Sequence, residues 1–312
     1  MWLSKRLFAG GQSGGSAPAT VGASGHGLAI DGAALPQSPV SLPLPVLSPP
    51  LDVDALRTLE ECAFNAWPAQ RIATVNGWVL RLSEGYTKRA NSANALCPTG
   101  SFKQTRALAE SFYARHDQPA IFRLSPLAGG EADAALADAG YQRTGETLVL
   151  CVPLAPRAGG LASRIGIAGI GNVPHHDEVQ RVMPHADAAW RLGYAQAADV
   201  PETARALHDR LLDAIAMPCG FAAVGPVSSP VGFGMGVVER DLLGLFDIVV
   251  HPMARRQGAA RRLMAQLMAW GRARGARQAY LQVVADNAPA ISLYRALGFC
   301  EAYRYHYRIA PP

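Results

Sequence analysis

The 312-residue chain has few cysteines and no long apolar run. Its five cysteines are scattered and form no Cys-x-x-Cys pair, so the sequence indicates neither a disulfide framework nor a zinc site. No apolar stretch approaches the roughly 20 residues that a membrane-spanning helix needs. Residues 1–10 carry Lys5 and Arg6 but lack the apolar core of a signal peptide. We therefore expect a cytoplasmic protein with no membrane partner.

Charge of either sign is also sparse, because charged residues make up 17% of the chain and the net charge is +5. A nucleic-acid-binding protein needs a clustered basic face with aromatic side chains, which is missing, so no nucleic-acid partner is expected. One group of histidines and aspartates lacks the spacing of metal ligands, so no metal is expected either. These residues are His175, His176, Asp177, His185 and Asp187.

The first 50 residues contain only three charged side chains and are rich in Gly, Ser, Ala and Pro. Such a composition cannot form a packed core, so residues 1–50 are predicted to be a disordered tail. The remaining length suits two domains of about 100–200 residues each. The sequence PLAPRAGG at residues 153–160 is typical of a linker between them. The predicted domains are residues 51–155 and 156–312.

In residues 51–155 helix and strand patterns alternate, which is typical of a mixed α/β fold. Helices are expected at residues 53–66, 102–115 and 131–139, and strands at 74–82, 119–124 and 141–152. Two interpretations are open for the segment 78–92, which includes the end of the strand expected at 74–82. It either forms a substrate-facing loop or a hairpin that packs the two halves together.

Residues 156–312 contain further helices and strands of the same kind. Helices are expected at residues 187–198 and 201–216, and strands at 221–224, 231–239, 279–284 and 303–309. In the last strand Tyr303, Tyr305 and Tyr307 alternate with charged or polar residues, the period of two that a half-buried strand shows.

One stretch, residues 242–270, combines a strand, a basic turn and an amphipathic helix. The apolar strand 245–250 ends at Pro252, and the helix begins after Gly258. A helix N-terminus presents unpaired N–H groups and a partial positive charge. Glycine followed by alanines lets a ligand approach the backbone, and the arginines around it add positive charge. The stretch therefore predicts a site for a pyrophosphate.

The pattern Arg255-x-x-Gly258-x-Ala260 resembles the acyl-CoA signature of the GNAT superfamily of N-acetyltransferases. Downstream, the segment from Asn287 through Tyr294 to Phe299 resembles a second element of the same family. The clear resemblance covers about residues 220–308. It implies an α/β fold with a central mixed sheet flanked by helices, and residues 51–155 look like a degenerate N-terminal copy in a tandem GNAT-like protein.

The resemblance also implies an acyltransferase that moves an acetyl group from acetyl-CoA to a primary amine by direct attack in a ternary complex. The acceptor is expected to be an amine on a small molecule or peptide, since a fold does not determine its substrate. A non-catalytic acyl-CoA-binding or regulatory protein is the alternative. The expected oligomeric state is a monomer or a homodimer.

Carried over from the family, the strand before the turn pairs with the pantetheine arm and the turn amides hold the pyrophosphate. The residues expected to bind acetyl-CoA are Ile248, Val249, Val250, Arg255, Arg256, Gln257, Gly258, Ala259, Ala260, Arg261 and Asn287. Tyr294 matches the family tyrosine that protonates the leaving thiolate, although core packing is the alternative for its side chain.

The general base is less defined, because the position where some family members carry a glutamate is Gln282 here. A glutamine cannot accept a proton at neutral pH, so Asp247, Glu239, His251 or an ordered water must do so. Asp247 is the preferred candidate, since a charge within an apolar strand is costly unless it serves a purpose. A salt bridge to a neighbouring arginine is the alternative for Asp247.

Overall fold

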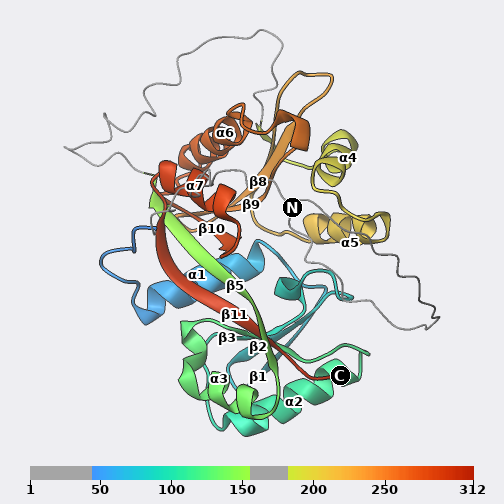
Figure 1. The fold of residues 1–312 in the computed structure, drawn as a ribbon, viewed down its shortest axis with the longest axis vertical. Coiled ribbons are helices and arrows are strands. Elements are labelled where there is room, and N and C mark those ends of the chain that lie inside the picture. The colour runs from blue at the N-terminus through green and yellow to red at the C-terminus, as the bar shows by residue number, and fades with distance from the viewer. Residues whose placement is uncertain (1–43, 155–181) are drawn as a thin grey trace, which may run out of the picture.

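The computed structural model of the chain describes residues 44–154 and 182–312. In these two ranges, eleven strands form one mixed sheet that is flanked by seven α-helices (Figure 1). The first half contains α1 (Val53–Asn65), β1 (Arg71–Val75), β2 (Trp78–Leu82), β3 (Ala93–Ala95), α2 (Phe102–Ala114), β4 (Ile121–Leu124), α3 (Gly129–Asp138) and β5 (Gln142–Pro153). The second half contains β6 (Val182–Met183), α4 (Ala188–Ala197), α5 (Glu202–Asp213), β7 (Cys219–Val224), β8 (Gly232–Glu239), β9 (Leu242–Val250), α6 (Ala259–Ala273), β10 (Gln278–Val284), α7 (Ala288–Ala296) and β11 (Cys300–Ile309). The predicted mixed α/β fold is confirmed.

The two halves repeat one order of elements. The first half runs β3, α2, β4, α3, β5, and the second runs β9, α6, β10, α7, β11. In each half the first two of these strands, β3 with β4 and β9 with β10, pair in parallel. This shared order agrees with a degenerate internal repeat.

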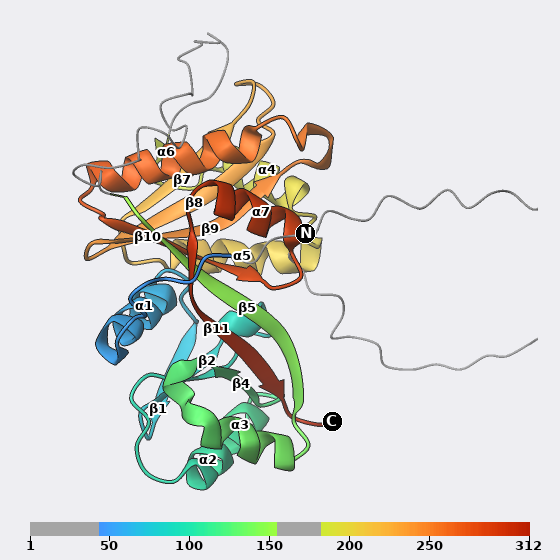
Figure 2. The same ribbon diagram turned by 60° about the vertical axis from the view of Figure 1, so that its left-hand side comes forward.

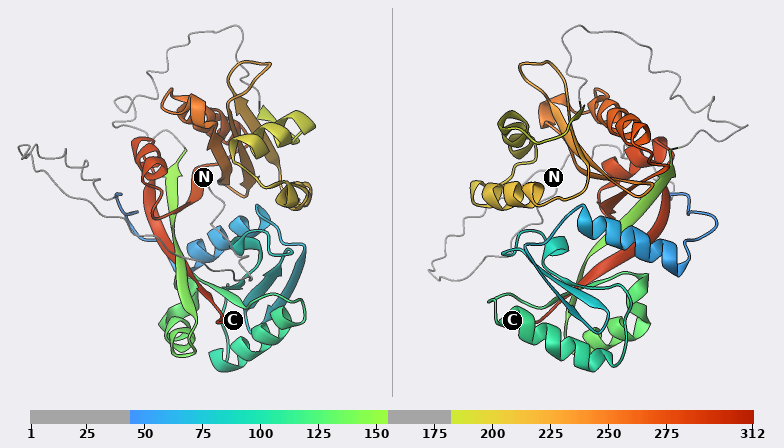
Figure 3. Two further views of the ribbon diagram at one scale, coloured as in Figure 1. Left: turned by 45° about the vertical axis from the view of Figure 1, so that its right-hand side comes forward. Right: turned by 180° about the vertical axis from the view of Figure 1, so that it is seen from behind.

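The two halves do not form separate sheets, because their last strands are interleaved. The strand order is β1-β2-β3-β4-β11-β5-β10-β9-β8-β7-β6. Thus β11, the last strand of the chain, pairs with β4, and β5 from the first half pairs with β10. The long ribbons of β5 and β11 run side by side between the two halves in Figure 3. The division into residues 51–155 and 156–312 therefore crosses a continuous sheet.

Helices cover both faces of the second half of the sheet. Figure 2 shows α6 and α7 on one face of β7 to β10 and α4 and α5 on the other. The predicted apolar stripe of α6 is confirmed, since Leu263, Met264 and Leu267 are fully buried. In β11 the side chains of Tyr303 and Tyr305 are buried as the alternating pattern predicts.

The strand predicted at residues 74–82 is wrong, because a hairpin divides it. Asn76 and Gly77 have φ angles of 47° and 75° and form the turn between β1 and β2. Asn-Gly is the dipeptide that best tolerates two consecutive positive φ angles in a two-residue hairpin turn. The Asn76-Gly77 dipeptide in the sequence was therefore enough to predict this hairpin.

The end of the predicted tail is attached to the sheet. Most of residues 1–50 and of the 153–160 linker lie outside the described residues, but Leu47 N–H donates to the Glu301 carbonyl at 2.7 Å. Glu301 N–H in turn donates to the Pro45 carbonyl at 2.8 Å. β4 pairs with β11 only from His306 onward, which leaves the backbone of Glu301 open to this segment. The tail boundary at residue 50 is therefore too late.

Candidate active site

The parallel strands β9 and β10 separate at their carboxyl ends. Their ladder stops at Leu245 and Leu281, although β9 continues to Val250 and β10 to Val284. Beyond that point β9 stays paired with β8, and β10 stays paired with β5. A wedge therefore opens between them, and the facing edges of both strands lack ladder partners there.

A β-bulge at Asp247 accompanies this separation. Asp247 has a φ of 53°, and the pairing with β8 shifts register opposite it. A bulge bends its strand and increases the local twist, which turns β9 away from β10. Gly234 on β8 lies opposite the bulge, and a Cβ there would come within 2.6 Å of Ile248 Cδ1. The glycine therefore gives the bulge the space that it needs.

The predicted cofactor residues of the strand all lie along this wedge. Ile248 and Val249 line a cavity at the wedge, and Val250 follows them opposite Gly232. An extended chain that enters a wedge of this kind can bond the exposed strand edge as an added strand does.

The predicted phosphate turn lies at the outer end of β9. Gly258 adopts a φ of 78° as the N-cap of α6, and no side chain in the described ranges caps this helix. The N–H groups of the first turn of α6 therefore keep the partial positive charge of a free helix start. Gln257 Nε2 donates to the Met253 carbonyl at 3.3 Å, and Arg255 Nε donates to the Val250 carbonyl at 3.2 Å, which stabilises the turn. The remaining predicted residues, Arg256, Ala259, Ala260 and Arg261, complete this turn and the first turn of α6.

The side chain of Asn287 caps helix α7 in the structure. Its side-chain oxygen accepts a hydrogen bond from Ala290 N–H at 3.3 Å and caps α7. Asn287 does not belong to the described residues that line the cavity. Its contact with the CoA arm stays a prediction.

We expect a charge at Gly258 to weaken acetyl-CoA binding beyond any effect of size. A Cβ at this position meets only Arg262 Nη1, at an ordinary 3.5 Å, and both Asn and Asp tolerate a positive φ. Gly258→Asp should raise the dissociation constant at least about tenfold relative to Gly258→Asn, because a unit charge about 4 Å from a phosphate costs roughly 1–4 kcal/mol. Calorimetric titration of acetyl-CoA into both variants measures this difference. Equal affinities would exclude a phosphate at the turn.

The cavity at the wedge is built from both halves of the chain. Of the segment 78–92, Tyr86, Thr87 and Arg89 line it, which agrees with the substrate-facing interpretation. Asn91 orders this loop, since its side chain accepts from Ser83 N–H at 2.7 Å. The other lining residues are Trp67, Tyr194, Ala198, Val200, Leu245, Phe246, Asp247, Ile248, Val249, Leu281, Gln282 and Tyr294.

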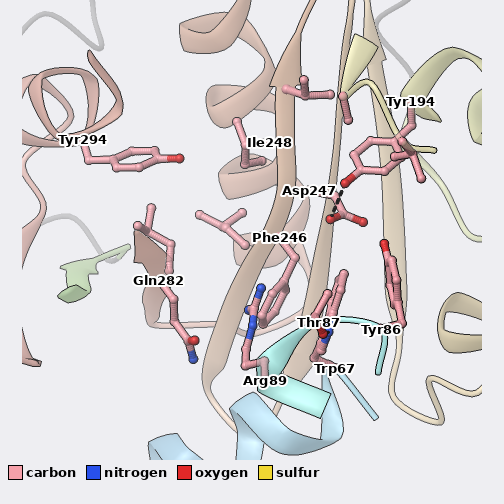
Figure 4. Close-up of a pocket in the computed structure, with 15 residues that line it drawn as sticks. Trp67, Tyr86, Thr87, Arg89, Tyr194, Phe246, Asp247, Ile248, Gln282 and Tyr294 are labelled. Atoms are coloured by element: carbon pink, nitrogen blue, oxygen red, sulfur yellow. Dashed lines mark hydrogen bonds between the residues drawn. The ribbon is translucent and has the colours of Figure 1, made fainter. Parts of the chain in front are cut away.

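Asp247 lies in the cavity wall beside Tyr194 (Figure 4), and both of its carboxylate oxygens have partners. Tyr194 Oη donates to Oδ1 at 2.8 Å, and His208 Nε2 lies 2.8 Å from Oδ2. The predicted alternative was a salt bridge from Asp247 to an arginine. The structure places His208 there instead, and this pair is a salt bridge when the histidine is protonated. Sequence reasoning missed Tyr194 and His208. A histidine within the apolar stripe of the predicted helix 201–216 was the available signal.

Tyr294 lies on the other side of β9 from Asp247 (Figure 4). Its side chain lines the cavity and also packs against Phe299, and its role as a proton donor stays a prediction. Burial raises the pKa of Tyr294 to about 12. The phenol therefore stays protonated at neutral pH and can donate a proton.

The remaining candidates for the base lie elsewhere or cannot act. Glu239 accepts from Asn65 Nδ2 at 3.0 Å and does not belong to the described cavity lining. His251 is exposed at the end of β9. Gln282 Oε1 accepts from Tyr305 Oη at 2.8 Å, while its buried Nε2 has no hydrogen-bond partner among the described residues. Asp247 is thus the candidate that the cavity contains.

Comparison with known proteins identifies the family. The family described as "Probable histone acetyltransferase Rv0428c C-terminal" matches residues 54–308 of the chain, which spans both halves. The chain belongs to this family. The acetyltransferase is also 28% identical over 269 residues to the uncharacterized N-acetyltransferase YobR of Bacillus subtilis (strain 168), which covers 82% of this chain and 99% of that protein.

Two further comparisons concern a short segment of the acetyltransferase and its overall fold. The [ribosomal protein bS18]-alanine N-acetyltransferase of Escherichia coli (strain K12) is 43% identical over 70 residues, or 22% of this chain and 47% of that protein. A solved structure, a tandem GNAT protein from the clavulanic acid biosynthesis pathway, matches with a TM-score of 0.55 at 17% identity, covering 86% of this chain and 90% of that one. This second likeness shows the fold.

The expectation of a GNAT N-acetyltransferase is therefore confirmed, and the protein is an acyltransferase. The non-catalytic alternative is not favoured, because the curated relatives are named as acetyltransferases. In the described ranges no group of three or more His, Cys, Asp or Glu side chains is arranged to hold a metal ion. No helix among the described residues has the length and apolarity to cross a membrane.

Proposed function

We propose that the acetyltransferase moves an acetyl group from acetyl-CoA to a primary amine by direct attack in a ternary complex. One observation carries this proposal: a single cavity at the β9–β10 wedge has Asp247 on one side of β9 and Tyr294 on the other (Figure 4). A group that accepts a proton and a group that donates one therefore face the same space. Such an arrangement suits direct transfer between two bound substrates.

Acetyl-CoA enters along the wedge in this proposal. The pyrophosphate binds the turn amides from Arg256 to Arg261, and the pantetheine arm bonds the free edge of β9 at Ile248 to Val250. The thioester then lies near the bulge at Asp247. The amine acceptor, on a small molecule or a peptide, approaches from the side lined by Trp67 and Tyr86, so the first half of the chain shapes its site.

The reaction needs three proton transfers. Asp247 accepts a proton from the ammonium form of the acceptor, which frees the nitrogen lone pair to attack the thioester carbonyl carbon. The tetrahedral intermediate collapses as the C–S bond breaks, and Tyr294 donates its phenolic proton to the departing thiolate. The second proton of the amine nitrogen returns to the phenolate through solvent. Asp247 then releases its proton to solvent, and the products are the acetylated amine, free CoA and one proton.

An acetyl-transfer assay with the full chain tests this function. Acetyl-CoA is incubated with a panel of primary amines, and CoA and acetylated product are separated by chromatography, because the exposed Cys97 would react with a thiol reagent. CoA and product should form in equal amounts only when the amine is present. Acetyl-CoA binding with no transfer to any amine would contradict the proposal.

Tyr294→Phe is expected to lower kcat about a hundredfold with an unchanged KM for acetyl-CoA, because a positioned general acid contributes about 10²–10⁴ in rate. Phenylalanine keeps the packing against Phe299 and removes only the hydroxyl. Because the pKa of Tyr294 is about 12, the wild-type rate should show no alkaline decline from this residue up to about pH 10. An unchanged kcat in the variant would assign Tyr294 to core packing alone.

A further inference from the structure

The acceptor side of the cavity carries one charge of each sign. Among the described residues that line it, Asp247 is the only carboxylate and Arg89 is the only basic side chain. Apart from Thr87 and Gln282, the other lining side chains are aromatic or aliphatic, and Trp67, Tyr86 and Phe246 are among them. Charges in such surroundings interact more strongly than in water, so ligand groups of opposite charge gain binding energy beside them.

Arg89 is held in a defined position. Its guanidinium carbon lies 4.8 Å from the ring centroid of Trp67 and 5.6 Å from that of Phe246. Its backbone carbonyl accepts a hydrogen bond from the buried Arg81 Nη1 at 2.8 Å. Stacking uses the flat face of a guanidinium, whereas the N–H groups point outward within its plane. Arg89 is thus suited to present a planar fork of donors to an anionic group.

The two charges lie near the same aromatic side chains. Burial raises the pKa of Tyr86, the Asp247 carboxylate raises it further, and the Arg89 guanidinium acts in the opposite direction. Burial and the same two charges act on the pKa of Tyr194 in the same way. Asp247 and Arg89 also line the same cavity, and the Arg89 guanidinium carbon lies 5.6 Å from the ring centroid of Phe246, the residue before Asp247. One small molecule can therefore reach both charges.

We propose that the acceptor is a small zwitterion of the amino-acid class, bound with its ammonium group at Asp247 and its carboxylate at Arg89. This inference rests on the proposed acetyl transfer and names the substrate class of that site. A guanidinium fork matches a carboxylate in a bidentate pair. A simple amine and a peptidyl lysine carry no carboxylate beside the amine, so neither gains this bidentate pair. The ammonium at Asp247 is also the group that must lose a proton before attack.

Matched acceptors test the inference in the wild-type enzyme. The probes are the common amino acids, their carboxamides and their decarboxylated amines, together with lysine-containing histone peptides. We expect kcat/KM for the best amino acid to exceed that of its carboxamide and its decarboxylated amine at least about tenfold, since a charged hydrogen-bond partner is lost. Equal rates for the three forms, or faster transfer to the peptides, would overturn the inference and leave acetyl transfer itself intact. Failure to acetylate any amine would overturn both.

Two variants test the role of Arg89. Arg89→Gln keeps donor groups but removes the charge, and it should reduce the preference for the acid over the carboxamide at least about tenfold. Arg89→Lys keeps the charge without the planar fork and should retain part of the preference. The affinity for acetyl-CoA, measured by calorimetry, should stay the same in both variants. An undiminished preference in Arg89→Gln would exclude Arg89 as the carboxylate partner, and the wild-type comparison holds even if a variant fails to fold.

Discussion

Asp247→Asn is expected to lower kcat by about 10²–10⁴, the contribution of a positioned general base. The amide has the shape of the carboxylate, and Asn tolerates the φ of 53° that the bulge requires. Tyr194 can still donate to its oxygen, so the substitution removes the charge and leaves the bulge. The affinity for acetyl-CoA should change little, because Asp247 is not part of the turn after β9 at which the pyrophosphate is proposed to bind.

Steady-state kinetics with a saturating amine and calorimetry with acetyl-CoA measure these two quantities. Tyr194→Phe is the matched control, since it removes one hydrogen bond to Asp247 but keeps the carboxylate. It should cost much less in kcat than Asp247→Asn. A near-normal kcat for Asp247→Asn would assign the base to ordered water instead.

Glu60→Gln is expected to lower the free energy of unfolding by about 3–5 kcal/mol, because it leaves a buried cation without its counter-charge. Glu60 on α1 and Arg123 on β4 have 0% and 1% side-chain exposure. Arg123 Nη2 donates to Glu60 Oε1 at 2.9 Å, and Arg123 Nη1 and Tyr303 Oη also donate to this carboxylate. The cluster thus joins a helix and two strands, one of them the last strand of the chain.

Urea unfolding followed by circular dichroism measures this loss. The matched control is the double variant Glu60→Leu with Arg123→Met, in which both charges are replaced by apolar groups of similar volume. Such replacements of a buried pair are often neutral or stabilising, so the double variant should recover most of the lost stability. If single and double variants were equally unstable, packing volume and not charge would explain the loss.

Local patterns predicted the elements of the site well. The strand and helix of residues 242–270 appear as β9 and α6, and the helix begins directly after Gly258, as predicted. These features depend on residues within one or two turns of each other, where a glycine, a proline or an apolar stripe acts directly on the backbone. The Asn76-Gly77 hairpin was equally local and could have been predicted from the same kind of signal.

Contacts between distant segments were outside the reach of these patterns. Tyr194 and His208 meet Asp247 only because α4 and α5 pack on the face of the sheet that the bulge turns toward them. Trp67 and Arg89 join the cavity across more than 150 residues of chain. The residues that neighbour Asp247 in the sequence do not indicate that Tyr194, His208 or Arg89 will lie near it.

The sequence by itself predicted the family, the turn between β9 and α6, and most of the helices and strands in each half. The tertiary structure alone decided which strands pair, and it interleaved β5 and β11 so that the two halves share one sheet. The physical reason is that the conformation of the backbone depends mainly on neighbouring residues. Which strands pair depends instead on burying whole faces of the sheet and on giving every backbone N–H and C=O a partner. The same long-range choice brings a carboxylate, a guanidinium and a phenol to one cavity.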